Sequence, residues 1–275
     1  MNPTKTIVIS GATGLIGRNL KKHFEKQQWK VIPLGRKDFG SNAEKLAEKI
    51  KGTDALVHLA GAPVIKRWTK EHKKEILNSR ILTTRRLVDA IGMMPKKPDV
   101  MISASAVGIY SPEGVHDEQS TQFAGDFLSG VCLDWEAEAE KAKGFTRLAI
   151  VRLGIVLARE GGALKTMLPP FRLGIGGKIA SGHQPFAWIH IEDVVKAIGF
   201  IIANNQTKGI YNFVAPGLIS NQQFTSALGK ALKRPTRFTV PAFALRLLYG
   251  EAAATLTGGQ KVIPKRLEKA GFEFK

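Results

Sequence analysis

Short apolar runs alternate with longer amphipathic stretches over roughly the first half of the chain, and this alternation constrains the fold more than any other feature. Continuous apolar runs are typical of strands buried on both faces, and the stretches between them have the spacing of amphipathic helices. A parallel sheet covered by helices satisfies both patterns, so we expect an α/β chain with a Rossmann-type doubly wound parallel sheet. The expected strands are 6–9, 30–34, 55–59, 100–103 and 148–151, and the expected helices are 15–28, 42–50, 70–91 and 128–143.

The regular alternation ends after the last of these strands. Glycine and proline interrupt residues 161–177, which is expected of loops that carry a binding site. From Pro216 the pattern is mostly helical, with a short strand near 237–240. We therefore expect a Rossmann domain over residues 1–157. Residues 158–275 would form substrate-side loops and a small, mostly helical C-terminal lobe, with some strands and helices returning to the main sheet.

The charge of the chain is strongly positive. Its 275 residues include 41 Lys and Arg against 23 Asp and Glu, a formal charge of +18. Such an excess favours anionic partners, which include nucleic acids and phosphorylated small molecules. The basic residues are scattered, however, without a basic arm or a zinc-finger or RNA-recognition signature. We therefore expect no nucleic-acid partner, and the charge favours an anionic small-molecule ligand.

The single cysteine and the first residues indicate the compartment. Cys132 alone can form neither an internal disulfide nor a cysteine-based zinc cluster, and we expect no metal. The chain begins Met-Asn-Pro-Thr-Lys-Thr, without the apolar segment of a secretory signal. No apolar run approaches the roughly 20 residues that span a bilayer. These features predict a soluble cytoplasmic protein with no membrane partner, and they leave the oligomeric state open.

A glycine-rich segment, Gly11-Ala-Thr-Gly14-Leu-Ile-Gly17, follows the first expected strand and opens the first expected helix. Glycine at these spacings allows a tight turn, a close approach of backbone amides to a pyrophosphate, and close packing of the helix on the sheet. Its position at the first strand-to-helix turn, within repeated strand–helix units, makes the motif specific for a dinucleotide. We expect cofactor contacts from Gly11, Thr13, Gly14, Leu15, Ile16 and Gly17.

The end of the second expected strand indicates which dinucleotide is bound. An acidic residue there bonds the ribose 2′-hydroxyl of NAD, whereas an arginine accommodates the 2′-phosphate of NADP. Here the strand ends Leu34-Gly35-Arg36-Lys37, with two cations before the first carboxylate, Asp38. A guanidinium can bind phosphate through two parallel hydrogen bonds. The sequence therefore predicts NADP, with Gly35 and Arg36 at its adenosine end; two solvated loop cations are the alternative.

Taken together, the motifs resemble the extended and atypical short-chain dehydrogenase/reductases, most closely the epimerase-family proteins with a short C-terminal domain. The resemblance covers nearly the whole chain and implies a nucleotide-binding oxidoreductase. Members of this group are often named nucleoside-diphosphate-sugar epimerases, and sometimes cell-division proteins. The segments that carry the resemblance are Gly11–Gly17, His58–Gly61, Ile102–Gly108, Val151–Val156, Trp188–Asp193, Val240–Arg246 and Gly259–Pro264.

The resemblance also implies cofactor contacts beyond the glycine loop. Arg80 lies where extended reductases commonly carry an asparagine near the cofactor, and an arginine there favours recognition of phosphate charge. A surface charge pair between Glu75 and Arg80 is the alternative. The implied contacts are Leu59, Ala60, Gly61, Glu75, Arg80, Ser103 and Val156, the last on the nicotinamide side.

The catalytic groups of the family are only partly present. Its members use a serine at the end of the fourth strand and a Tyr-x-x-x-Lys on the next helix, in which the tyrosine transfers a proton and the lysine lowers its pKa. Ser105 matches the serine, but no tyrosine of this chain has a lysine four residues later. Cys132 or Val131 occupies the tyrosine position, and Glu136 or Trp135 the lysine position. The candidate replacements are Tyr110, Glu136, His183 and His190, and we place Ser105, Tyr110 and His190 in the catalytic set.

These motifs predict an NADP-dependent oxidoreductase or a nucleotide-sugar-epimerase-like enzyme, but the missing tyrosine and lysine leave enzymatic activity undecided. Arg172, Lys178 and His183 on the substrate-side loops suit a small-molecule substrate that is sugar-like or phosphorylated, with solvated loop charges as the alternative. The rival function is a non-catalytic NADP-binding protein that senses the cofactor or binds a partner, for example in cell division.

Overall fold

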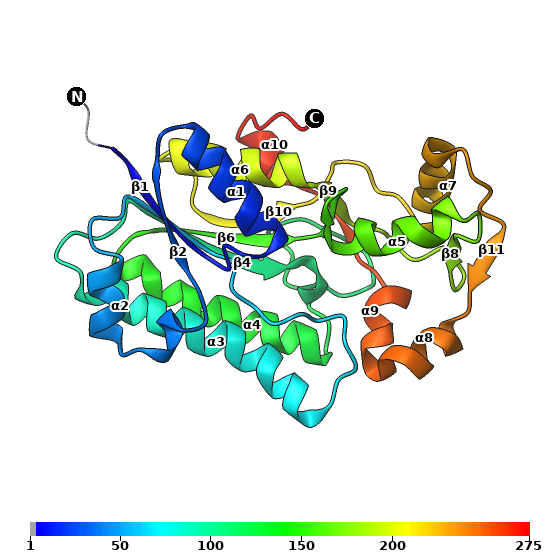
Figure 1. Cartoon of the computed structure of the whole chain (residues 1–275), viewed down its shortest axis with the longest axis horizontal. Helices are drawn as coiled ribbons and strands as arrows, with labels where there is room; N and C mark the ends of the chain where they lie inside the picture. Colours follow the sequence, from blue (N-terminus) through cyan, green and yellow to red (C-terminus); the bar gives the residue numbers. More distant parts are fainter. Residues whose placement is uncertain (1–3) are drawn as a thin grey trace.

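A six-stranded parallel sheet forms the centre of the molecule in the computed structural model, which describes residues 4–275 (Figure 1). The strand order across the sheet is β10-β6-β4-β3-β1-β2, and every pairing in it is parallel. The predicted Rossmann-type architecture is therefore confirmed. Residues 1–3 lie outside the described residues. They belong to the N-terminal segment that was predicted to carry no secretory signal. The strands are β1 (Thr6–Ser10), β2 (Lys30–Leu34), β3 (Ala55–His58), β4 (Val100–Ala106), β6 (Arg147–Leu153) and β10 (Gly209–Phe213).

Helices cover both faces of this sheet (Figure 1). On one face lie α1 (Leu15–Lys26), α6 (Ile191–Ala203) and α10 (Lys265–Lys269). On the other lie α2 (Ala43–Lys49), α3 (Lys70–Met93) and α4 (Phe127–Glu140), followed by a 3-10 turn over Lys141–Gly144.

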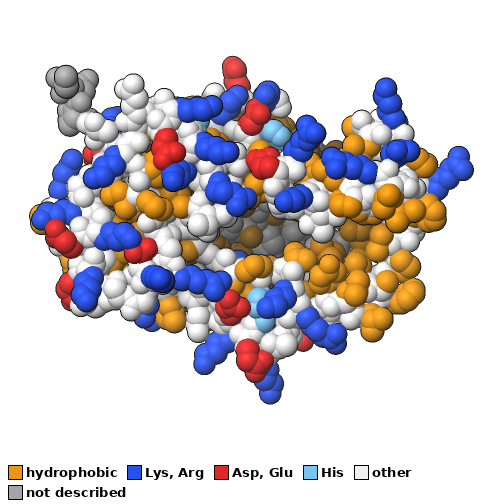
Figure 2. All heavy atoms as spheres, in the orientation of Figure 1, with side chains coloured by type: hydrophobic (Ala, Val, Ile, Leu, Met, Phe, Trp, Pro, Cys, Tyr) orange, Lys and Arg blue, Asp and Glu red, His pale blue; other side chains and the backbone are white. Residues whose placement is uncertain are grey.

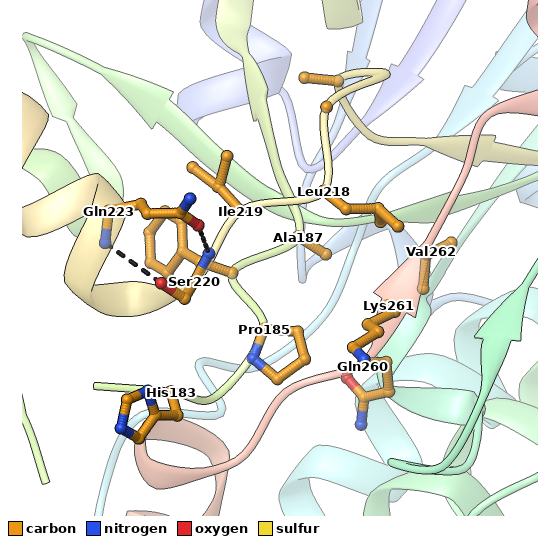
Figure 3. A pocket seen from close by; sticks show the side chains of 13 residues that line it. His183, Pro185, Ala187, Leu218, Ile219, Ser220, Gln223, Gln260, Lys261 and Val262 are labelled. Atoms are coloured by element: carbon orange, nitrogen blue, oxygen red, sulfur yellow. Dashed lines mark hydrogen bonds between the residues drawn. The ribbon is translucent and has the colours of Figure 1, made fainter. Parts of the chain in front are cut away.

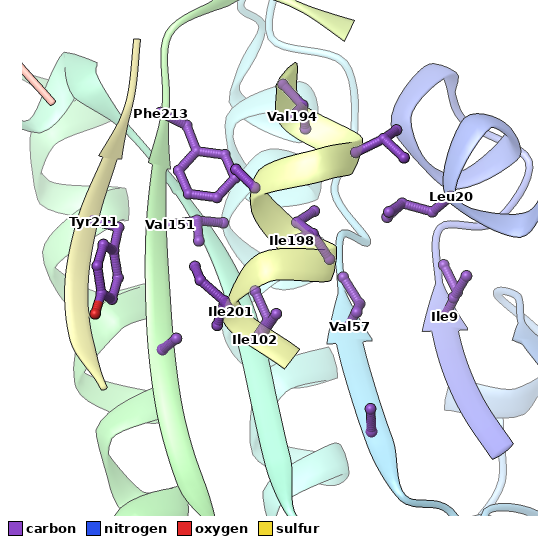
Figure 4. Packing of buried hydrophobic residues seen from close by; sticks show 14 of the residues in the cluster. Ile9, Leu20, Val57, Ile102, Val151, Val194, Ile198, Ile201, Tyr211 and Phe213 are labelled. Atoms are coloured by element: carbon purple, nitrogen blue, oxygen red, sulfur yellow. The ribbon is translucent and has the colours of Figure 1, made fainter. Parts of the chain in front are cut away.

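Side chains of each strand alternate between two buried clusters, because successive residues of a strand point to opposite faces. In β1, Ile7 and Ile9 belong to the cluster under α1 and α6, whereas Val8 belongs to the cluster under α2, α3 and α4. Figure 4 shows the first cluster, where Leu20 of α1 and Ile198 of α6 lie over the strands. Burial on both faces explains why the strands are continuous apolar runs in the sequence.

The chain order reverses between β1 and β3. From β1 the chain first places β2 on one side, and all later strands of the sheet are added on the other side, beginning with β3. In doubly wound sheets, ligands bind outside the carboxyl ends of the strands at such a reversal. The fold therefore predicts a binding site at the ends of β1 and β3.

The second half of the chain contributes to the main sheet as well as to the substrate side. β10 pairs with β6, and α6 packs on α1. The expected boundary between residues 157 and 158 divides β7, because that strand continues to Ala158 and pairs with β9. Three parallel two-stranded pairs complete the substrate side: β5 (Val115–His116) with β12 (Lys261–Val262), β7 (Ile155–Ala158) with β9 (Trp188–His190), and β8 (Gly177–Ile179) with β11 (Phe238–Val240).

Four further helices lie in this half: α5 (Gly162–Arg172), α7 (Asn221–Leu232), α8 (Ala242–Tyr249) and α9 (Ala254–Thr257). The short strand expected near 237–240 is β11. β4 is longer than expected and ends at Ala106, so that Ser105 lies within the strand and its side chain faces the neighbouring helix α4.

Candidate functional site

The glycine loop lies at the chain reversal, between the ends of β1, β2 and β3. Gly11 has a φ of +70°, which favours glycine, and its N–H donates to the Leu34 carbonyl at the end of β2. A Cβ on Gly11 would lie 3.0 Å from the carbonyl carbon of Leu59, just beyond β3. The backbone at this position therefore needs both the conformation and the small size of glycine.

The N-terminus of α1 is open to an anion. Its N-cap, Gly14, makes no side-chain cap, and the first turn contains no acidic residue. A Cβ on Gly17 would lie 2.3 Å from the Gly11 carbonyl oxygen, so only glycine lets the helix begin this close to the loop. Amide groups at the start of a helix attract phosphate through their unsatisfied N–H groups and the helix dipole. Of the other loop residues in the predicted set, Thr13 is exposed, while Leu15 and Ile16 are half-buried against the core.

Arg36 projects from the end of β2 into solvent. Its side chain is 89% exposed, and its guanidinium lies 3.6 Å from Glu75 of α3. The second oxygen of Glu75 contacts His72 Nδ1 at 3.1 Å, which fixes the carboxylate between the two. The predicted residues Arg36 and Glu75 are thus neighbours beyond the end of β2.

The carboxylate of Asp38 is used inside the same loop. It accepts a hydrogen bond from Gly35 N at 2.7 Å and pairs with Lys49. Partial burial acts to raise the pKa of Asp38, but the Gly35 amide and Lys49 outweigh it and lower the pKa. Asp38, the acid nearest the end of β2, therefore has both carboxylate oxygens bonded within the protein and leaves none free for a ribose hydroxyl.

A chain of buried hydrogen bonds holds the end of β3. Ser10 Oγ accepts from the backbone amides of Leu59 and Ala60, at 3.0 and 3.2 Å, so its proton is donated to His58 Nδ1 at 2.6 Å. His58 then donates from Nε2 to Thr84 Oγ1 at 2.9 Å. Burial lowers the pKa of His58 to about 3, which keeps the ring neutral and agrees with this tautomer. The chain positions the backbone that was predicted to line the cofactor.

Arg80 lies against the loop that follows β3. Its guanidinium donates to the carbonyls of Ile76 and Ala62 and lies over the Trp135 ring at 5.3 Å. A Cβ on Gly61 would lie 3.0 Å from its Cζ, so Gly61 makes room for it. Burial lowers the pKa of Arg80, and no carboxylate among residues 4–275 pairs with it. Arg80 therefore turns inward and does not form the surface pair with Glu75 that was the alternative, while its contact with the cofactor stays a prediction.

Ser105, Glu136 and Arg152 form a buried network behind the carboxyl ends of β4 and β6. Ser105 Oγ donates to Glu136 Oε1 at 2.6 Å. Arg152 donates through Nε and Nη2 to the two oxygens of Glu136, at 2.8 and 2.7 Å. Burial lowers the pKa of Arg152, but the hydrogen bonds and charge of Glu136 outweigh it and raise the pKa above its usual value. Glu136 lies on α4 and is one of the two residues, with Trp135, predicted at the lysine position of the family.

Tyr110 belongs to the same network, and its hydroxyl is directed into the protein. Its side chain is fully buried, and its hydroxyl accepts from Arg152 at 2.8 Å and donates to Asn212 Oδ1 at 2.9 Å. Burial raises the pKa of Tyr110, although Arg152 opposes this. The ring also stacks on His116 at 5.0 Å. Both hydrogen-bond partners of the Tyr110 hydroxyl lie inside the protein, and this argues against the predicted catalytic role of Tyr110.

The remaining predicted residues lie in different places. Ser103 is fully buried in β4, and Val156 is half-buried in β7. His190 is the N-cap of α6, and its Nδ1 accepts from Glu192 N at 3.4 Å. The structure does not bring His190 into hydrogen-bond contact with Ser105 or Tyr110.

Cys132 is 6% exposed and lies next to Ser105 on α4. Burial and the charge of Glu136 raise the pKa of its thiol to about 11. It therefore remains a neutral thiol at physiological pH, and if Cys132 rather than Val131 takes the position of the family tyrosine, it does not take over the proton transfer.

The surface is hollowed between α1 and α5 on one side and α3 and α8 on the other (Figure 2). Beyond the ends of β6 and β10, a cavity of about 190 Å³ extends the substrate side. Figure 3 shows this cavity between two segments of the chain, one with His183 and Pro185 and the other with Gln260 and Lys261. A larger cavity of about 690 Å³ lies at the amino-terminal edge of the sheet, away from the glycine loop. No cluster suited to a metal ion occurs within residues 4–275.

Sequence reasoning missed how Arg152 and Asn212 contribute, as well as the Ser10–His58–Thr84 chain. A usable signal was present in one case, since an arginine in the middle of the apolar run Leu148–Val156 has to be paired when the strand is buried. Nothing in the local sequence identifies Glu136 as its partner, because the two residues lie on different elements.

The sheet order, the glycine loop at the chain reversal and the position of Ser105 define a Rossmann-type protein of the short-chain dehydrogenase/reductase kind. Residues 7–213 match the NAD dependent epimerase/dehydratase family, and residues 240–275 match a domain of unknown function that carries the number 1731. The chain belongs to the NAD dependent epimerase/dehydratase family, as the resemblance implied.

Relatives and solved structures support this over nearly the whole chain. An Arabidopsis thaliana protein named as a chloroplastic homologue of epimerase family protein SDR39U1 is 41% identical, covering 98% of this chain and 83% of its own length. An epimerase family protein of Staphylococcus haemolyticus is 36% identical, covering 98% and 95%. The human epimerase family protein SDR39U1, solved with NADPH, has a TM-score of 0.91 and 34% identity, covering 98% and 95%.

Proposed function

We propose that this protein binds NADP(H) and is an oxidoreductase of the epimerase family that acts on a small-molecule substrate. One observation carries the proposal: an uncapped helix N-terminus without acidic residues begins at the chain reversal, beside the exposed Arg36. The human relative solved with NADPH supports the same cofactor. Bound cofactor supplies or accepts a hydride, and the protein's residues orient the reactants and move the proton.

The residues fit a phosphorylated dinucleotide. Gly11, Gly14 and Gly17 let the loop and the start of α1 pack closely, and the uncapped N-terminal amides of α1 offer donors to a pyrophosphate. Arg36 offers a guanidinium to a 2′-phosphate, and the loop's nearest carboxylate is held by Gly35 and Lys49. A site built for NAD would present a free carboxylate at this position.

The proton path that we propose runs through Ser105. Its Oγ can take a proton from a substrate hydroxyl while its own proton passes to Glu136 Oε1, which lies 2.6 Å from Oγ, as oxidation of an alcohol requires. Arg152 holds the carboxylate in place through both oxygens. The mostly buried, unpaired charge of Arg80 favours negative charge on a substrate or cofactor oxygen nearby.

Cofactor choice is tested by fluorescence titration with NADPH and NADH. The wild-type protein should bind NADPH more tightly, and Arg36→Ala should remove most of that preference, since a charge-assisted contact is worth roughly tenfold or more in affinity. Lys45→Ala, an exposed cation of α2 outside the loop, is the matched control and should leave both affinities unchanged. Equal affinities of the wild-type protein for the two cofactors would contradict the role of Arg36.

A second candidate function is a cofactor-binding protein without turnover. The observations that favour it are that Ser105 already donates its proton to Glu136 and that the neighbouring Cys132 is a neutral thiol. The two functions are separated by measuring NADPH oxidation and NADP⁺ reduction against panels of carbonyl compounds, alcohols and nucleotide sugars. Turnover that disappears in Ser105→Ala supports the oxidoreductase, whereas cofactor binding without turnover across the panels supports the second candidate.

A further inference from the structure

One lobe of the substrate side carries cations and no acids. We call it the basic lobe and define it as residues 161–184 and 217–250, which contain α5, β8, α7, β11 and α8. It contains eight basic residues and neither Asp nor Glu, and all the basic residues except Lys178 are exposed. They are Lys165, Arg172, Lys178, Lys230, Lys233, Arg234, Arg237 and Arg246.

The same lobe exposes large apolar side chains. On α8, only Leu245 is buried among the large residues, while Phe243, Leu247 and Leu248 are 74%, 75% and 65% exposed. Four more exposed apolar side chains lie outside α8: Leu173, Ile175, Leu218 and Phe238, which are 75%, 55%, 47% and 55% exposed. Single exposed apolar residues are ordinary, but a group of this size on one lobe indicates an interaction surface.

The apolar side chains gather at one end of the molecule. Figure 2 shows them over the region of α8, β8 and β11, with Lys and Arg side chains around them and no Asp or Glu among them. α8 is held at its C-terminal end, where Arg67 Nη1 donates to the Leu247 carbonyl at 3.3 Å and Lys73 pairs with Glu251 just beyond the helix. The helix is thus fixed with its apolar side chains outward.

We propose that the basic lobe docks on an anionic lipid bilayer, with α8 lying in the plane of the interface. A bilayer offers hydrocarbon just below a layer of anionic headgroups, and this matches apolar tips surrounded by cations. A second copy of this chain is a poor occupant, because two surfaces that each carry eight cations and no acids repel each other. An acidic protein would satisfy the charges, but a fluid interface better accommodates apolar side chains that project from several separate segments.

Contact of this kind is peripheral. No helix within residues 4–275 has the length and apolar character needed to cross a bilayer. The sequence analysis predicted no membrane partner. The proposal departs from that prediction, because it places the basic lobe on a membrane surface. Leu218 belongs both to the basic lobe and to the lining of the cavity in Figure 3, so docking would bring the substrate side close to the headgroups.

Vesicle flotation with the full-length protein tests the proposal. The probes are vesicles of phosphatidylcholine alone and vesicles in which about a third of the lipid is phosphatidylglycerol, at low and physiological salt. The wild-type protein should float with the anionic vesicles and not with the neutral ones. The double substitution Arg234→Glu with Arg237→Glu should weaken binding at least about 30-fold, since each basic residue near the surface contributes roughly fivefold. Phe243→Glu with Leu247→Glu should abolish it.

Matched controls separate the basic lobe from general surface effects. Lys45→Glu with Lys51→Glu reverses the same number of charges at exposed positions of α2 and the turn after it, and Met93→Glu places an acid at an apolar position that is 52% exposed outside the lobe. Both should bind anionic vesicles like the wild-type protein to within about twofold, on the same scale. Retention that does not depend on phosphatidylglycerol, or equal loss in the controls, would overturn the proposal.

Two further measurements identify a different occupant. A dimer of the wild-type protein in size-exclusion chromatography that Phe243→Glu with Leu247→Glu dissociates would assign the surface to a second copy and reject the membrane. Absence of flotation at low salt would reject it as well and leave an acidic protein as occupant. The affinity for NADPH should remain unchanged in all variants of the basic lobe. A loss of vesicle binding in these variants can therefore be distinguished from a damaged cofactor site.

Discussion

The buried pair of Glu136 and Arg152 provides the sharpest test of how the site is held together. Arg152 is 2% exposed and makes two hydrogen bonds to Glu136 and one to the Tyr110 hydroxyl. The substitution Arg152→Met keeps much of the side-chain volume but leaves Glu136 buried with Ser105 as its remaining side-chain donor. Removing one partner of a buried ion pair costs about 3–5 kcal/mol, because an uncompensated charge remains in the protein.

That cost is a large share of the roughly 5–15 kcal/mol that stabilises a typical folded protein. It should lower the melting temperature by on the order of 10 °C in a chain of this length. Urea unfolding, followed by circular dichroism and tryptophan fluorescence, measures the free energy directly. The double variant Glu136→Gln with Arg152→Met should recover part of the loss, because it leaves no buried charge, and the resulting cycle should give a coupling of at least about 2 kcal/mol.

An exposed ion pair serves as the control. Lys21 and Glu25 lie 3.7 Å apart on α1 and are 47% and 50% exposed, so Lys21→Met should cost less than about 1 kcal/mol. If Arg152→Met costs as little as Lys21→Met, Glu136 is not held as a buried charge and the account of the network is wrong.

Three further predictions concern the glycine loop, the buried histidine and the cysteine. Gly17→Ala should weaken NADPH binding at least about tenfold, because the new Cβ would lie 2.3 Å from the Gly11 carbonyl oxygen. Gly40→Ala is the control and should leave the affinity unchanged, because a Cβ there has no neighbour within 4 Å. Fluorescence titration with NADPH measures both affinities. The folded protein holds the pKa of His58 near 3 against about 6.5 when unfolded, so this histidine stabilises the fold above pH 6.5 and the contribution falls as the pH drops toward 3. Between pH 7 and 4 the wild-type protein should lose ~3 kcal/mol more unfolding free energy than His58→Gln, and an equal loss would exclude a neutral buried ring. The pKa of the Cys132 thiol is near 11, so iodoacetamide at pH 8 should label it only after unfolding; rapid labelling of the folded protein would contradict its burial.

The sequence by itself determined the sheet and the position of the dinucleotide loop. Both depend on patterns within a few residues: apolar runs that form strands such as β1 and β6, and glycines at 11, 14 and 17. The steric demand of Gly17 is equally local, since its neighbours are Gly11 and Ala12. Local patterns of this kind can be predicted from one sequence because the same short segment carries both cause and effect.

The tertiary structure alone decided the catalytic surroundings. Ser105 and Glu136 are 31 positions apart and Tyr110 and Asn212 are 102 apart, and they meet because β4, α4 and β10 pack in a particular register. Their meeting depends on helix rotation and strand order, which the composition of each segment does not encode. For this reason the sequence did not reveal that Tyr110 is buried in this network or that Arg80 turns inward to the Ala62 carbonyl.

Exposure was decided in the same way. The segment of α8, Ala-Phe-Ala-Leu-Arg-Leu-Leu-Tyr, has the composition of a core helix, yet three of its largest apolar side chains face solvent. An apolar residue is buried only if another element covers it, and whether one does depends on the packing of the whole chain. The sequence therefore determined that the helix forms, while the tertiary structure decided that its apolar side chains remain on the surface.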